Sequence, residues 1–317
     1  MVFDITLGNY KLRMLDKVEI HKSQELLADT ATITLPSSQF NVALDVESKI
    51  SRGDAVSIKF GYKETGMVDE FEGWIQRIAT DGGNITIECE DDLHLMRKAV
   101  TNKTFKKVSL KAILEYIVSQ CGVALDIDCT YSWSYSKFVI NNATGYEVLK
   151  KVQEDCGADI FILDNKLCVH APGESNKDLN KKVYYDFARN VEKESLNYHD
   201  SADKKFEIVV KANQPDGTVK EIKVGSTGGD KIEIKCATSD DASMKARANA
   251  ELKRRCFSGY DGNITTWLIP HCIPGDSAVL HDSDYPEKDG TYFVNSVTTS
   301  FSSAGGSRKV DISFRLS

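Results

Sequence analysis

Two short stretches with the same design decide the fold of this chain: residues 51–62 read SRGDAVSIKFGY and residues 273–282 read IPGDSAVLHD. Each contains a Gly-Asp pair, Gly53-Asp54 or Gly275-Asp276, that leads into an apolar run. Glycine permits a positive φ, and the short aspartate side chain bonds to nearby backbone, so the pair predicts a turn before a buried strand. Arg52 completes an adhesion-like Arg-Gly-Asp tripeptide, but Pro274 replaces it in the second stretch. The turn, and not the arginine, is therefore what repeats.

Other features recur in the same order around these two turns. They are a strand pair with an Ala-Asp turn, the Gly-Asp strand, a strand opened by a glycine, a Gly-Gly turn and a last strand. The members are 18–35 and 191–210, Gly73 and Gly290, TDGGN (80–84) and SAGGS (303–307), and the final strands 85–93 and 309–316. Five features in one order predict a duplicated antiparallel β-barrel, the second copy carrying an insertion.

Between the two predicted barrels, the apolar period changes from two residues to that of a helix. SLKAILEYIVSQCG (109–122) and TGYEVLKKVQEDCG (144–157) each begin at a capping residue and end at a glycine. A strand follows each helix, so the unit is αβ, made twice. We therefore expect a mainly β fold with an α+β insert, divided into 1–99, a first barrel, 100–172, a small αβ domain, and 173–317, a second barrel with a helix-containing insertion at about 213–262.

Bulk composition excludes several classes of protein. The 317 residues are 41% hydrophobic, which suffices for globular cores, and the formal net charge of -7 argues against a general binder of nucleic acid or anionic membrane. The N-terminal residues lack the pattern of a signal peptide, and no apolar run is long enough to cross a bilayer. The eight cysteines form no CxxC, so we expect free thiols that pack as small hydrophobes.

The candidate catalytic and metal-binding groups lack the spacing that such sites require. His271 and Cys272 are adjacent on a strand, so they point to opposite faces and cannot act together as base and nucleophile. The acid pairs carry no mark of a glycosidase and suit solvated turns or helix starts, and the histidines and cysteines lack metal-ligand spacing. The residues considered are His94 with Cys89, His170 with Cys168, His281, Glu90-Asp91-Asp92, Glu154-Asp155 and Asp240-Asp241. We expect no catalytic, cofactor or metal site.

An aromatic cluster in CTYSWSYSK (129–137) allows two interpretations. Tyr131, Trp133 and Tyr135 alternate with serine and share one face of a strand. The rings would either pack on the αβ domain or form a contact with another subunit or partner, since Trp and Tyr are favoured interface anchors.

The ordered motifs as a set resemble a known family. ADTATITLP (28–36), RGDAVSIKFGY (52–62), FEGWIQRI (71–78), NITIECEDDL (84–93), the 144–169 segment, IPGDSAVLHD and DGTYFVNSVTTSF (289–301) resemble the baseplate hub proteins of contractile-tail phages. That family includes the late control protein D group and the hub portion of type VI secretion spike proteins. The resemblance covers nearly the whole chain, and it rests on structural patterns and not on catalytic motifs.

The resemblance implies an architecture and a role. Both barrels would resemble the tail-tube subunit, and three chains would form a ring with pseudo-sixfold symmetry. A hexameric tail tube would sit on one face and a separate trimeric spike on the other, because this sequence ends at the second barrel. The protein would be non-enzymatic, assembled in the bacterial cytoplasm and located in the virion, with no cofactor and no membrane partner, and DNA only as passing cargo. A cell-wall-acting enzyme or carbohydrate-binding module is the alternative. A tail-tube subunit would need one barrel, and the sequence predicts two.

Overall fold

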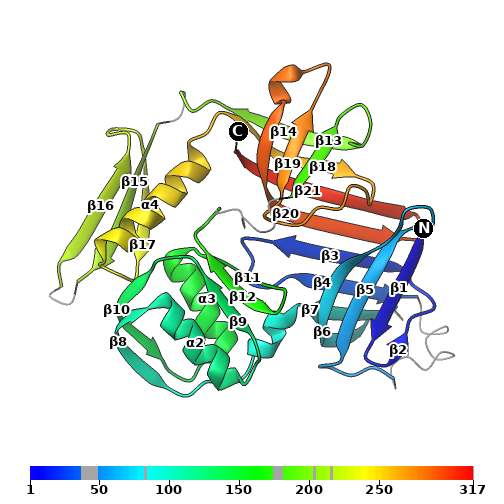
Figure 1. The fold of residues 1–317 in the computed structure, drawn as a ribbon, viewed down its shortest axis with the longest axis horizontal. Coiled ribbons are helices and arrows are strands. Elements are labelled where there is room, and N and C mark those ends of the chain that lie inside the picture. The colour runs from blue at the N-terminus through cyan, green and yellow to red at the C-terminus, as the bar shows by residue number, and fades with distance from the viewer. Residues whose placement is uncertain (37–48, 82–83, 174–180, 203–204, 215–216, 317) are drawn as a thin grey trace.

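The computed structural model describes residues 1–36, 49–81, 84–173, 181–202, 205–214 and 217–316. Most of these residues lie in β-strands, which confirms the expected mainly β class (Figure 1). In this part of the chain, α-helix is confined to α2 (Leu110–Cys121), α3 (Gly145–Cys156) and α4 (Asp241–Arg255). None of these helices is both long and apolar enough to cross a membrane.

One sheet of 13 strands forms the body of the molecule and contains two sets of strands. The first half comprises β1 (Val2–Leu7), β2 (Tyr10–Lys11), β3 (Lys17–Ser23), β4 (Thr30–Leu35), β5 (Ala55–Tyr62), β6 (Gly66–Asp81) and β7 (Asn84–Glu90). The second half comprises β13 (Lys182–Asp186), β14 (Lys193–His199), β18 (Gly259–Thr266), β19 (Ser277–His281), β20 (Gly290–Ser302) and β21 (Gly305–Arg315).

The two halves have the same strand order. In the first half the order is β3-β4-β7-β6-β5-β1, and in the second it is β14-β18-β21-β20-β19-β13. The pairings differ in one respect, because β1 is antiparallel to β5 whereas β13 is parallel to β19. The predicted duplication is thus present in the pairing of the strands, while closure of each half into a barrel stays a prediction.

A third unit lies beside the sheet and has its own core. It contains a pair, β8 (Lys103–Ser109) with β10 (Ser134–Ile140), and a sheet in which β12 (Lys166–His170) joins β11 (Asp159–Leu163) and β9 (Asp126–Cys129). The helices α2 and α3 start and stop where the sequence predicts. Ser109 and Thr144 accept hydrogen bonds from backbone N–H groups of the first turn, and Gly122 and Gly157 adopt the left-handed conformation at the ends.

The inserted segment differs from the expected one. Residues 191–199 were expected to pair with 205–212, but β14 pairs with β18, which comes after the insertion. The insertion therefore begins after His199, earlier than the expected residue 213. Its strands form a separate sheet, β16-β15-β17, of β15 (Phe206–Asn213), β16 (Val219–Gly225) and β17 (Asp230–Cys236). Apolar side chains of this sheet and of α4 join the core of the αβ unit, and that burial decides the pairing.

Some predicted turns fall outside the described residues. Asp203, of the second Ala-Asp turn, and Gly82 and Gly83, of the first Gly-Gly turn, are among them. At the second Gly-Gly turn, β20 and β21 form a hairpin whose last pair is Ser302 with Gly305.

Candidate assembly surfaces

The first Gly-Asp turn immediately precedes β5 and is held by four hydrogen bonds, two within the turn and two to Ile75 of β6. The Asp54 N–H donates to the Ser51 carbonyl at 3.1 Å, and the Asp54 carboxylate accepts from the Ser51 N–H at 2.7 Å. The Gly53 N–H donates to the Ile75 carbonyl at 2.8 Å, and the Ile75 N–H donates to the Asp54 carbonyl at 2.9 Å. Gly53 has a φ of +88°, which glycine adopts without strain.

The second Gly-Asp turn has the same four bonds. The Asp276 N–H donates to the Ile273 carbonyl at 3.2 Å, and the Asp276 carboxylate accepts from the Ile273 N–H at 3.0 Å. The Gly275 N–H donates to the Val294 carbonyl at 2.9 Å, and the Val294 N–H to the Asp276 carbonyl at 3.0 Å. Gly275 has a φ of +92°. Ile75 of β6 and Val294 of β20 are therefore equivalent positions in the two halves.

Gly73 and Gly290 are not equivalent positions, contrary to expectation. Gly290 opens β20, but Gly73 lies inside β6, which already begins at Gly66. Counted from the equivalent residues Ile75 and Val294, the two glycines are out of register by two positions. Gly73 has a packing role of its own, because a Cβ there would lie 2.1 Å from the carbonyl oxygen of Glu90 on β7. The two glycines therefore occur at similar places in the sequence for different structural reasons.

The two halves of the chain are joined by a strand pair and an aromatic contact. β20 pairs with β3 over seven residues, from Ser296 opposite Ser23 to Ser302 opposite Lys17. Phe301 leaves the second half and enters the core of the first, where it stacks on Phe60 with ring centroids 4.9 Å apart. We call the β20–β3 pair and its contacts the intrachain joint.

A buried ion pair completes the intrachain joint. Arg308 of β21 and Glu70 of β6 are 1% and 2% exposed. The guanidinium donates to both carboxylate oxygens of Glu70, at 2.6 and 3.2 Å, and to the Thr299 hydroxyl at 2.8 Å. The carbonyl of Leu268 accepts two further bonds. In the sequence, Glu70 stands among other acids in VDEFEG, so nothing local distinguishes it from a solvated side chain.

The aromatic cluster lies inside the chain, which contradicts its interpretation as an interface. Tyr131, Trp133 and Tyr135 are 6%, 3% and 1% exposed. Their rings form a row with centroid separations of 5.6 and 6.1 Å, and the Tyr131 hydroxyl donates to the Cys156 carbonyl. Side chains of the inserted segment belong to the same core. The row of rings is covered because the insertion, which begins earlier in the chain than expected, packs over it.

His271 and Cys272 lie in the segment between β18 and β19 and not on a strand, contrary to expectation, and both are held in neutral, inert forms. Burial, with Arg308 as the next cause, lowers the pKa of His271 to about 3, and burial raises the pKa of the Cys272 thiol to about 12. At neutral pH the thiol is therefore protonated, and a thiolate is what nucleophilic catalysis requires. His281 lies elsewhere, exposed and paired with Asp289 at 3.0 Å.

The acidic run Glu90-Asp91-Asp92 is less solvated than expected, because Glu90 is buried, and each of its residues has a structural partner. Glu90 pairs with Arg97, and Asp92 accepts a bond from the Trp74 indole at 2.9 Å. The carboxylate of Asp91 accepts from the N–H groups of Leu93 and Asp29, both at 2.9 Å. Burial, reinforced by the nearby charge of Asp29, raises the pKa of Asp91. Farther along the chain, Asp240 caps α4, and burial raises the pKa of Asp155 to about 6.

Among the described residues, one cluster combines a cysteine, a histidine and an aspartate in the manner of a metal site. Asp128, Cys168 and His170 bring three potential ligand atoms within 4.8 Å of one another, whereas His94 and Cys89 do not join them. His170 Nε2 lies 3.4 Å from the Asp128 carboxylate, and burial raises the pKa of Cys168 to about 11. All eight cysteines are free thiols, and Cys256 is the exposed one.

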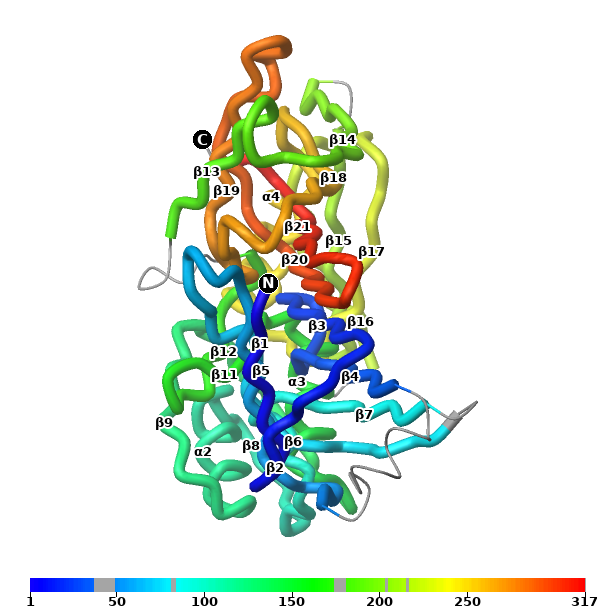
Figure 2. Tube along the Cα trace, turned by 90° about the vertical axis from the view of Figure 1, so that its right-hand side faces the viewer, coloured from blue at the N-terminus to red at the C-terminus, as the bar shows by residue number. Residues whose placement is uncertain are grey.

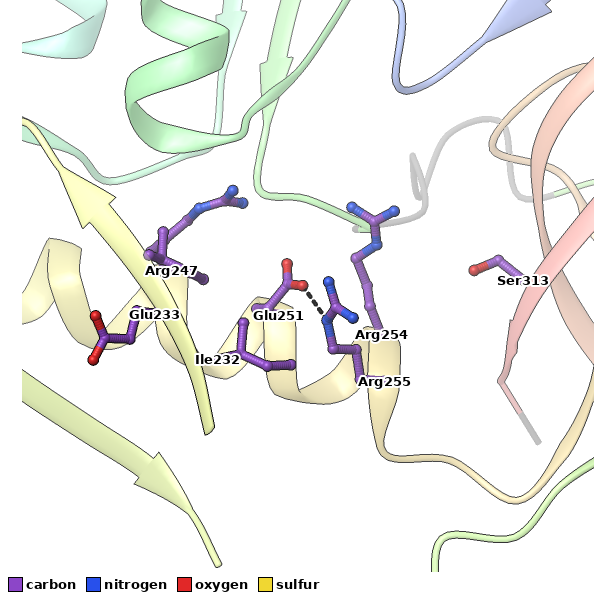
Figure 3. Close-up of a pocket in the computed structure, with 8 residues that line it drawn as sticks. Ile232, Glu233, Arg247, Glu251, Arg254, Arg255 and Ser313 are labelled. Carbon is purple, nitrogen blue, oxygen red and sulfur yellow. Dashed lines mark hydrogen bonds and ion pairs between the residues drawn. The ribbon is translucent and has the colours of Figure 1, made fainter. Parts of the chain in front are cut away.

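An open hollow of about 560 Å³ lies between the inserted segment and the second half, lined by α4, β17 and Ser313 of β21. Figure 3 shows that its arginines, Arg247, Arg254 and Arg255, come from one helix, α4. Arg255 pairs with Glu251 in the same helix, and Arg254 pairs with Glu25 of the first half. Lys253-Arg254-Arg255 forms the last turn of α4, where cations interact favourably with the helix dipole.

Solved structures of tail proteins share this fold over almost the entire chain. A tail protein from Neisseria meningitidis is 13% identical, with a TM-score of 0.66, and covers 98% of this chain and 95% of its own. The 43 kDa tail protein of prophage MuSo2 from Shewanella oneidensis is 15% identical, with a TM-score of 0.65. The match covers 98% of this chain and 97% of that protein. An E. coli type VI secretion component is 10% identical, with a TM-score of 0.59. The match covers 99% of this chain and 77% of that protein.

Sequence comparison finds less than structural comparison. No family model and no curated protein matches the sequence. The expected resemblance to phage tail and type VI secretion proteins is confirmed at the level of the fold.

Proposed function

We propose that this protein is the structural baseplate hub of a phage tail or of a related contractile injection system. One observation carries the proposal: a single chain contains the same six-strand order twice, and its two copies are joined edge to edge by β20 and β3. The shared fold with tail and type VI secretion proteins supports it. Among the described residues, His271 and Cys272 also stand in inert protonation states at neutral pH.

In this proposal three chains close into a ring. Three chains with two similar halves each supply six near-equivalent units, and such a ring can match a hexameric tube on one face and a trimeric spike on the other. The proposal includes the division into 1–99, 100–172 and 173–317, with the inserted segment attached to the core of the middle unit. The hub would be assembled in the bacterial cytoplasm, reside in the virion and act without catalysis.

Mass measurement in solution, combined with negative-stain imaging, tests the proposal. The chain has a mass of 35.2 kDa, and we expect a ring of about 106 kDa, three chains, with six lobes around one opening. A protein that stays monomeric at high concentration, both alone and mixed with tube and spike proteins from the same genome, would contradict it. Cleavage of purified peptidoglycan by the protein would contradict the non-enzymatic role.

A further inference from the structure

The strands of the intrachain joint have counterparts elsewhere in the same chain. The seven residues of β14 (Lys193–His199) correspond to the seven of β3 (Lys17–Ser23), because each strand pairs with the equivalent neighbour in the same register. On the other side of the joint, β6 corresponds to β20. The Gly-Asp turn binds Ile75 in one and Val294 in the other, and a one-residue bulge follows directly in both. Arg77 therefore corresponds to Ser296.

In β20 both edges are used, but in β6 one edge is open beyond the turn. From Ser296 onward, β20 pairs with β21 on one side and with β3 on the other. From Arg77 onward, β6 pairs with β7, whereas its pairing with β5 ends at Trp74, opposite the first residue of β5, Ala55. Within the described ranges, no strand pairs with this second side of residues 76–79. We call it the β6 edge.

The counterpart of β3 is open as well. β3 lies between β4 and β20, whereas β14 pairs with β18 and, among the strands that the structure describes, with nothing on its other side. The difference appears in burial. Ile20 is 1% exposed, while its counterpart Leu196 is half-buried and the next residue on that face, Tyr198, is 57% exposed. We call this side of β14 the β14 edge.

We propose that the β14 edge of one copy pairs with the β6 edge of the next copy, repeating between chains the pairing that β3 and β20 make within one. The proposal rests on the proposed ring and gives its contact and register. Replacing each residue of the joint by its counterpart places Arg77 opposite His199, Ile78 opposite Tyr198 and Ala79 opposite Asn197 of the next copy. The Ile78–Tyr198 pair would cover the exposed ring with an apolar side chain, a favourable cross-strand combination.

A second copy of this chain is the occupant that the geometry favours. The two edges lie far apart, with β14 in the upper part and β6 in the lower part of both views, so one chain cannot pair them with each other (Figures 1 and 2). The contact is head-to-tail, and each copy offers one edge of each kind. Such contacts generate a closed ring or an open filament, and a ring leaves neither edge exposed to unintended pairing.

Disulfide cross-linking tests the register. Ala79 and Asn197 correspond to Thr298 and His21, whose side chains touch at 3.0 Å inside the chain. In a Cys256→Ser background, the protein with Ala79→Cys and Asn197→Cys should oxidise to covalent species of two and three chains. The intrachain control, His21→Cys with Thr298→Cys, should lose two thiols without a change of mass. An offset control, Ala79→Cys with Ser195→Cys, should cross-link at least tenfold more slowly, since disulfides need Cα atoms within about 7 Å.

The outcomes separate this inference from the proposed function. A ring of three chains in which the matched pair fails to cross-link, while the intrachain control does, overturns the pairing and leaves the hub standing. Equal cross-linking of the offset pair overturns the register. A protein that forms no ring under any condition overturns the hub and the pairing together.

Proline substitution gives an independent readout. The Gln24 N–H donates to the Asn295 carbonyl at 3.0 Å, so by alternation the Lys22 N–H faces β20 and its counterpart, the Tyr198 N–H, faces the open side. Tyr198→Pro should therefore weaken ring formation by about tenfold or more with a folded monomer, whereas Lys22→Pro should destabilise the monomer itself. Unchanged assembly of a folded Tyr198→Pro protein would overturn the pairing.

Discussion

Replacement of Arg308 by methionine should be strongly destabilising, because it leaves Glu70 as a buried charge without a counterion. The guanidinium and the carboxylate are 1% and 2% exposed, so water cannot replace the lost partner without opening the joint. Removal of one member of such a pair costs about 3–5 kcal/mol. The carbonyl of Leu268 and the hydroxyl of Thr299 also lose bonds from Arg308, which keeps the expectation at the upper part of that range.

The double variant Glu70→Leu with Arg308→Met provides the matched comparison. Replacement of both charges by apolar side chains removes the desolvation cost together with the attraction, so it is expected to restore most of the loss. Urea unfolding followed by circular dichroism gives the free energy of unfolding for the wild type, both single variants and the double variant. The double-mutant cycle then isolates the interaction between the two side chains.

Two results would refute this reasoning. A loss below about 1 kcal/mol for Arg308→Met would show that the pair is solvated in the native state, as surface pairs are. A double variant as unstable as the sum of the two single variants would show that the cost comes from altered packing and not from the unpaired charge. In either case the buried pair would not be what holds the two halves together.

Three further predictions concern single residues. Burial raises the pKa of Asp159 to about 7, so its contribution to stability is complete below pH about 4, is lost as pH rises, and is absent above pH about 7. Asp159→Asn should thus stabilise the protein by up to roughly 4 kcal/mol at pH 8 and little at pH 4, as thermal unfolding at both pH values would show. Gly53→Ala and Gly275→Ala should each lower the free energy of unfolding by about 1–2 kcal/mol, because alanine is strained at a positive φ. Gly275→Ala should cost more than Gly53→Ala, since a Cβ at residue 275 would lie 3.0 Å from the Gln24 side chain. Equal urea midpoints for the two variants would contradict this difference. Trp133→Ala should lower the free energy of unfolding by about 3–5 kcal/mol, because it truncates a core side chain, and should leave the number of chains in the assembly unchanged. Urea unfolding and mass measurement check these two expectations. A changed number of chains with little loss of stability would show that the Trp133 side chain belongs to an interface between subunits.

Local features were the ones that the sequence could predict. The caps of α2 and α3 depend on hydrogen bonds within about four residues, and each Gly-Asp turn is closed in part by bonds between the aspartate and the residue three positions before it. Both partners of each interaction therefore stand in the same short stretch. The alternation of apolar residues likewise identifies strands such as β3, β5 and β7, because it reflects one buried face.

Pairing over long distances could not be read in the same way. The β14 sequence is compatible with β15 or with β18 as its neighbour, and the choice falls on β18 because the sheet and helix of the insertion gain more by packing on the αβ core. For the same reason Tyr131 and Trp133 are buried although an interface would suit their composition.

The sequence by itself determined that this chain carries one structural unit twice around an αβ segment, since turns and strand patterns are local and repeat visibly. The tertiary structure alone decided how the copies meet: β20 lies on β3, Phe301 enters the first core and Arg308 reaches Glu70, 238 positions away. A charged residue buried at such a joint is indistinguishable in sequence from a solvated one, because only the folded chain removes it from water.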